Sequence, residues 1–81
     1  MNFEEVKKEV VNDLEYTLGR KLNTKEFMDL DRNLEEHQLC WEELCEQDGD
    51  VIGFECYKDC ETNKIVVDCS FCSDILASFD K

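Results

Sequence analysis

Residues 23–47 read NTKEFMDLDRNLEEHQLCWEELCEQ. Apolar residues recur there every three or four positions, which predicts one amphipathic helix from Asn23 or Thr24 to about Gln47. His37 falls on the same side of this helix as the apolar residues. The face that we expect to pack against the core consists of Phe27, Leu30, Leu34, Trp41, Leu44 and Cys45.

Another amphipathic helix is predicted before this one, over residues 2–18. Its apolar residues share one face because they recur at helical spacing, and they are Phe3, Val6, Val10, Leu14 and Leu18. Asn2 suits the N-cap, and Gly19 suits the position just after the helix. The connection between the two helices is short, so they should be neighbours in space.

After the helices, apolar and polar residues alternate, which predicts a β-hairpin of Val51–Asp59 and Lys64–Phe71. One face of the hairpin should carry the apolar residues Ile52, Phe54, Cys56, Ile65, Val67, Cys69 and Phe71. A last short helix is predicted with Ser73 as its N-cap. Its residues that we expect to face the core are Ile75, Leu76 and Phe79.

The order of predicted elements is therefore α-α-β-β-α. This is an α+β fold with two amphipathic helices, a β-hairpin and a short C-terminal helix, the helices packing on one face of the hairpin. A chain of 81 residues is expected to form a single small domain, residues 1–81. The 42% of apolar residues are enough to supply a core, which argues against disorder.

The most unusual property of the composition is its charge. The chain has 21 Asp and Glu residues against nine Lys and Arg, a net charge of −12. Residues 26–50 hold ten of the acids and a single base, Arg32. A field of this sign repels nucleic acid and acidic membranes and attracts basic protein surfaces. We therefore expect no direct binding to nucleic acid or to a membrane.

The cysteines and the N-terminal sequence indicate a compartment. No segment is long and apolar enough to span a bilayer, and the first residues lack the basic start and apolar run of a secretory signal. We therefore expect a cytoplasmic protein whose six cysteines are reduced. Buried thiols behave as small hydrophobic side chains, so we expect those of the hairpin to serve the core without a cofactor.

A zinc-binding adaptor is the alternative reading of the cysteines. One possible set of ligands comes from the hairpin and its turns: Cys56, Cys60, Cys69 and Cys72. A second set would join His37 and Cys40, one helical turn apart, to a hairpin pair. Zinc knuckles place their cysteines on Gly-rich turns, whereas Cys56 and Cys69 are expected within strands. Core thiols are therefore favoured over zinc, and disulfides rank last.

No catalytic signature is present in the sequence. His37 is the single histidine, and it lies beside apolar residues, so we interpret it as structural rather than as half of a Cys40–His37 dyad. Residues 48–59 begin like a calcium loop but lack the oxygen ligand at position 5 and the Glu at position 12. No phosphate-binding loop or nucleophile elbow occurs. We therefore predict that the protein is not an enzyme.

The acidic arc of residues 23–47 is the strongest candidate for a functional surface. A solvated helix usually mixes Lys with Glu, but Arg32 is the one base among these acids, so their carboxylates are expected to repel one another without relief. Met28 and Leu39 stand among the acids, as apolar anchors do at protein interfaces. The predicted partner-binding residues are Met28, Asp29, Asp31, Glu35, Glu36, Leu39, Glu42, Glu43 and Glu46.

These observations predict a small intracellular inhibitor that docks a carboxylate-rich helix on the basic, nucleic-acid-binding surface of a partner protein. In length, charge and lack of a catalytic motif the chain resembles the small acidic inhibitors that phages and other mobile elements encode, including nucleic-acid mimics and anti-CRISPR proteins. The resemblance is one of type and assigns no residues. A further alternative is a homo-oligomer in which Met28 and Leu39 meet their symmetry mates, and its dimerisation would strengthen with salt.

Overall fold

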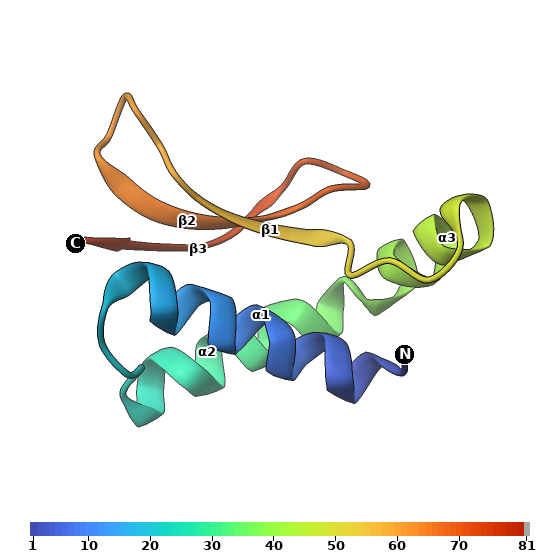
Figure 1. Ribbon diagram of the computed structural model, residues 1–81, viewed down its shortest axis with the longest axis horizontal. Coiled ribbons are helices and arrows are strands. Elements are labelled where there is room, and N and C mark those ends of the chain that lie inside the picture. Colours follow the sequence, from blue (N-terminus) through green and yellow to red (C-terminus); the bar gives the residue numbers. More distant parts are fainter. Residues whose placement is uncertain (81) are drawn as a thin grey trace.

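The computed structural model describes residues 1–80, so Lys81, the last residue of the expected domain, lies outside the described residues. Three helices precede three strands, in the order α1 (Phe3–Leu18), α2 (Thr24–Glu36), α3 (Gln38–Asp48), β1 (Phe54–Lys58), β2 (Lys64–Cys69) and β3 (Ile75–Asp80). The strands form one antiparallel sheet in the order β1-β2-β3. Figure 1 shows α1 and α2 beneath one face of the sheet and α3 at one end of the molecule. The predicted α+β class is confirmed.

Helix α1 follows its local sequence signals. The side chain of Asn2 accepts a hydrogen bond from the backbone N–H of Glu5, and the Glu5 carboxylate accepts one from the N–H of Asn2, which completes a capping box. Gly19 ends the helix in the left-handed conformation, with φ of 75°. The predicted inner face is buried as expected, at Phe3, Val6, Val10, Leu14 and Leu18.

The prediction of one helix from residue 23 to residue 47 is wrong, because the chain breaks at His37. In an unbroken helix the N–H of His37 would donate to the carbonyl of Asn33. The Nδ1 atom of the His37 ring instead lies 2.9 Å from that carbonyl oxygen, and the His37 N–H donates to the carbonyl of Leu34 at 3.0 Å. The side chain of His37 thus replaces the backbone N–H of His37 as the partner of the Asn33 carbonyl. As a result, α2 ends at Glu36 and α3 begins at Gln38.

The predicted C-terminal helix is also wrong, since residues 75–80 form strand β3. Ser73 is not a helix N-cap; it has φ of +64° and turns the chain back toward β2. Strand β3 then pairs with β2, from Asp68 opposite Ile75 to Lys64 opposite Asp80, with a bulge between Val67 and Asp68. The run Ile75–Phe79 is too short for periodicity to separate a helix from a strand, and pairing with β2 decides the outcome.

The hairpin itself is confirmed, although its strands are shorter than predicted. Phe54 lies opposite Cys69 and Cys56 lies opposite Val67, which puts the predicted apolar residues on one face. Strand β2 is central and carries three consecutive buried residues, Ile65, Val66 and Val67. The last residue of the predicted strand, Phe71, is an exception, because it is exposed in the turn before β3.

The expected core face of the middle segment is only partly correct. Leu30 and Leu34 are buried, but Phe27 is 47% exposed. Trp41 is half-buried, with its ring 5.3 Å from that of Phe3 between centroids, and its Nε1–H donates to the carbonyl of Val51 at 2.8 Å. Trp41 therefore joins α3 to α1 and to the segment that leads into β1.

Among residues 1–80, no helix combines the length and the apolar character that are needed to cross a bilayer.

Candidate functional site

The break at His37 divides the predicted partner-binding residues between two helices. Those on α2 are Met28, Asp29, Asp31, Glu35 and Glu36. Those on α3 are Leu39, Glu42, Glu43 and Glu46. The two groups have different electrostatic surroundings.

Carboxylates of α2 are paired with cations of the same chain. Lys25 and Arg32 lie 3.0 and 3.3 Å from the carboxylate of Asp29. The ammonium group of Lys7, on α1, lies 3.1 Å from Asp31 and 2.8 Å from Glu35. The expectation that these acids lack relief within the chain is therefore wrong for Asp29, Asp31 and Glu35.

Lys7 is the residue that sequence reasoning missed. Its side chain is only 8% exposed, and its ammonium group also lies 3.3 Å from Glu4. Burial lowers the pKa of Lys7, but hydrogen bonds to Glu35, Asp31 and Glu4 outweigh burial and raise that pKa above its ordinary value. A signal was present, because Lys7 follows Phe3 by four positions and so shares the inner face of α1.

The acids of α3 form a different surface. Leu39, Glu42, Glu43 and Glu46 have the spacing i, i+3, i+4 and i+7, so they share one face of the helix. All four are exposed, and Leu39 is exposed to 75%. We call these four residues the outer face of α3. The opposite face is half-buried and consists of Cys40, Trp41, Leu44 and Cys45.

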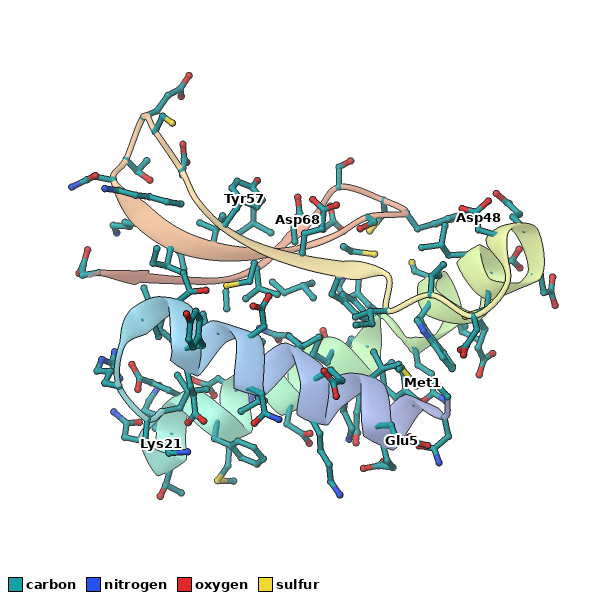
Figure 2. The ribbon with its side chains drawn as sticks, viewed as in Figure 1. Met1, Glu5, Lys21, Asp48, Tyr57 and Asp68 are labelled. Atoms are coloured by element: carbon teal, nitrogen blue, oxygen red, sulfur yellow. The ribbon has the colours of Figure 1, made fainter. Side chains whose placement is uncertain are left out.

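The outer face of α3 has no cation of its own. Within residues 1–80, no salt bridge reaches Glu42, Glu43 or Glu46, and the recorded side-chain contact is a 3.3 Å hydrogen bond from Gln38 to Glu42. The last turn of α3 contains Glu46 and Asp48 and no base. Negative charge there opposes the helix dipole. Figure 2 shows Asp48 at the far end of α3, away from the sheet.

Helix α3 is also weakly anchored by apolar packing. None of its eleven described residues is fully buried, and no side chain caps its N-terminus. Gly53 makes close contact with it instead: a Cβ atom at this position would lie 3.1 Å from Cδ1 of Trp41 and 3.3 Å from Cδ2 of Leu44. The acidic helix is thus the charged, lightly packed end of the molecule.

A cluster of cysteines lies where α3 meets the turn between β2 and β3. The Sγ atoms of Cys40, Cys69 and Cys72 are all within 4.8 Å of one another. Potential ligand atoms of His37, Cys72 and Asp74 also lie within 4.8 Å of one another, so Cys72 belongs to both groups. All six cysteines of the chain are free thiols.

The hairpin set of cysteines is not brought together. Among residues 1–80, neither Cys56 nor Cys60 belongs to a group of three or more potential metal ligands. Burial raises the pKa of the Cys56 thiol, although a hydrogen bond with Thr17 opposes that shift. Cys56 therefore faces α1, as a core thiol would, while Cys60 is exposed in the turn after β1.

The turn that carries Cys69 and Cys72 is held by backbone hydrogen bonds. The N–H of Ser73 donates to the carbonyl of Cys69 at 2.7 Å, and the N–H of Cys69 donates to the carbonyl of Asp74 at 2.9 Å. A hydrogen bond from the Asp74 backbone lowers the pKa of Cys72, but burial and the neighbouring Cys69 and Asp74 side chains raise it to about 11. The two thiols thus share one small, ordered turn.

No protein-family model, curated protein or solved structure matches this chain.

Proposed function

We propose that this protein is an inhibitor that docks the outer face of α3 on a basic, nucleic-acid-binding surface of a partner protein. The observation that carries the proposal is the composition of that face, where three carboxylates without an internal cation follow the exposed side chain of Leu39 along the helix. The carboxylates would imitate the phosphates of a nucleic acid. No catalytic step enters the proposal.

Electrostatics supports binding to a cationic surface. Ion pairs with Lys7, Lys25 and Arg32 already weaken the field of α2, whereas the field of α3 is uncompensated. The anionic residues at the C-terminal end of α3 disfavour the helix by about 0.3–1 kcal/mol each. A partner that supplies Lys or Arg would remove this cost and would gain fast, steered association from the net charge of −12.

Leu39 supplies the apolar part of the interface. Full burial of a leucine side chain contributes about 1.5–3 kcal/mol, and three quarters of this one is still exposed. An apolar side chain beside charged ones suits a protein interface, where the centre is dry and the rim is polar. Met28 and Glu36 are also exposed on α2, and we place them at the edge of the same interface.

Affinity capture with two matched triple variants tests the proposal. The first replaces Glu42, Glu43 and Glu46 with Lys on the outer face. The control replaces three exposed acids elsewhere, Glu9, Asp13 and Glu61, also with Lys, so that both variants change the net charge by the same amount. The wild type and the control should retain a basic nucleic-acid-binding protein that the outer-face variant loses. Circular dichroism confirms that each variant is folded.

Two outcomes would contradict the proposal. One is a folded outer-face variant that retains the same partner as the wild type. The other is equal loss of the partner from both triple variants, which would mean that net charge alone attracts it. The homo-oligomer joined through Met28 and Leu39 stays a prediction, and sedimentation at increasing salt concentration would reveal it.

A further inference from the structure

The cysteine cluster combines two pairs of residues with the spacing of metal ligands. His37 and Cys40 are three positions apart at the start of α3, and Cys69 and Cys72 are three positions apart at the turn between β2 and β3. The two pairs come from segments about 30 residues apart in sequence, and folding places three of their sulfur atoms within 4.8 Å of one another. Such pairs chelate zinc in structural sites.

We infer that His37, Cys40, Cys69 and Cys72 bind one Zn²⁺ ion in a tetrahedral, structural Cys₃His site. The inference goes beyond the docking proposal and does not depend on it. The set also differs from the hairpin set suggested by cysteine spacing alone, since it excludes Cys56 and Cys60.

The sulfur atoms are close to the separation that zinc requires. In a tetrahedron with Zn–S bonds of about 2.3 Å, two sulfur ligands are about 3.8 Å apart. The three Sγ atoms lie within 4.8 Å, so small side-chain rotations would bring them to that distance. Zinc binds well to thiolate and imidazole ligands, whereas Mg²⁺ and Ca²⁺ prefer oxygen ligands. A set of three cysteines and one histidine therefore favours zinc.

His37 is oriented as a ligand. Its Nδ1 lies 2.9 Å from the carbonyl oxygen of Asn33. A carbonyl can only accept, so Nδ1 donates its hydrogen to Asn33, and Nε2 is the ring nitrogen left to bind a metal. That nitrogen lies on the side of Cys72 and Asp74. A ligating histidine ordinarily donates its other ring N–H to a carbonyl or carboxylate, and Asn33 already provides that second partner.

The turn of Cys69 and Cys72 has an unusual backbone conformation. Ser73 has φ of +64°, a conformation that non-glycine residues seldom adopt and that tends to occur at functional sites. This turn directs Cys69 from the end of β2 and Cys72 from the loop toward one point, beside Cys40 of α3. Cys72 and the turn are exposed, so an ion can enter from solvent.

Asp74 competes with His37 for the fourth position. Its carboxylate lies 3.4 Å from Nε2 of His37. We assign the fourth ligand to His37, because the ring is already held by Asn33 and belongs to a chelating pair with Cys40. Asp74 is then a neighbour of the ligands rather than one of them.

A metal at this point would explain how α3 is held. The helix buries none of its described residues fully, so apolar packing attaches it only through the half-buried inner face. Zinc would tie its first turn, through His37 and Cys40, to the turn between β2 and β3. The ion would therefore fix the direction of α3 relative to the sheet.

Native mass spectrometry of the wild-type protein tests the site first. The protein should carry one Zn²⁺ per chain, and after chelation the metal-free protein should bind one equivalent of added Zn²⁺. Removal of the metal should lower the melting temperature by about 10–20 °C, as expected for a ligand present at about 100 times its Kd or more. Added Co²⁺ should give the visible absorption of a tetrahedral, thiolate-bound ion. Wild-type protein that binds no zinc would overturn the inference, whatever the variants do.

Single variants then test the ligand set. Cys40→Ser, Cys72→Ser and His37→Gln should each weaken zinc binding by at least tenfold, because each removes a ligand and even the loss of a ligand's hydrogen-bond partner costs about that much. The matched controls Cys56→Ser, Cys60→Ser and Asp74→Asn should bind zinc as the wild type does. Loss of zinc from the Cys56 and Cys60 variants, or from Asp74→Asn but not His37→Gln, would show that the assigned set is wrong.

Discussion

The ammonium group of Lys7 lies 2.8 Å from a carboxylate oxygen of Glu35, the shortest of the ion pairs in residues 1–80. The pair joins α1 to α2 across 28 positions of sequence. It also decides which part of the acidic segment is available to a partner. Because Lys7 neutralises carboxylates of α2, most of the uncompensated charge of this segment lies on α3.

Replacing Lys7 with methionine tests the structural role of this ion pair. Methionine keeps most of the apolar stem but removes the ammonium group, and Asp31 and Glu35 then repel each other. Urea unfolding should show that Lys7→Met destabilises the fold by about 1–2 kcal/mol. This value is near the lower end of the range for hydrogen bonds to charged groups, because both carboxylates are partly exposed to solvent. A variant as stable as the wild type would mean that the pair contributes nothing to folding.

The same pair predicts a pH dependence at high pH. The folded-state pKa of Lys7 is raised, so its stabilisation is fully present below the ordinary lysine pKa of 10.5 and is lost as pH rises through the folded-state pKa. The wild type should therefore lose more stability than Lys7→Met between about pH 10 and pH 12. Equal loss in the two proteins would assign the alkaline transition to other groups.

Gly53 and Gly19 form a matched pair for testing how α3 is packed. Both have positive φ, 82° and 75°, so alanine is strained at either position. Nothing lies within 4 Å of a Cβ at Gly19, whereas a Cβ at Gly53 would meet Trp41 at 3.1 Å. Gly19→Ala should cost about 1–2 kcal/mol from backbone strain alone. Gly53→Ala should cost about 1–3 kcal/mol more, because it also overpacks the Trp41 contact. Equal losses in thermal unfolding would show that Trp41 moves aside freely.

Glu46 should reveal a conflict between stability and binding. The residue lies in the last turn of α3, where its charge opposes the helix dipole and adds to the repulsion from Glu42 and Glu43. Glu46→Lys should therefore stabilise the isolated protein by about 0.3–1 kcal/mol while weakening partner binding. A variant that is both more stable and a better binder would contradict a docking role for this face. Urea unfolding and surface plasmon resonance measure the two effects.

Local signals made part of the fold predictable. Asn2, Glu5 and Gly19 mark the ends of α1 through contacts within a few residues, so sequence alone located that helix. The alternation around Phe54 and Val67 likewise predicted which face of the hairpin is buried. Side chains of a strand point alternately to its two faces, so the apolar residues can be buried together on only one of them. Exposure of Leu39 followed from the same helical spacing that placed the acids.

The remaining features depend on particular contacts, which the spacing of apolar residues in the sequence does not reveal. The break at His37 arises because a ring nitrogen competes with a backbone amide for one carbonyl, that of Asn33. Strand β3 forms because β2 has a free edge, which a short run such as Ile75–Phe79 does not reveal by itself. The cysteine cluster depends on both of these features, since it assembles only where the start of α3 meets the turn before β3. Sequence spacing offered His37 and Cys40 with a hairpin pair as one possible set, but it did not show which pair they would meet.

Competition with nucleic acid is the most direct test of the docking proposal. The measurement is the affinity of the captured partner for its DNA or RNA, by fluorescence anisotropy, with increasing amounts of this protein. Wild-type protein and the Glu9, Asp13 and Glu61 control should displace the nucleic acid, and displacement should weaken as salt screens the charges beyond about 8 Å. The folded variant with Lys at positions 42, 43 and 46 should displace none. A partner that binds the wild-type protein and its nucleic acid together, with unchanged affinity for each, would contradict the account.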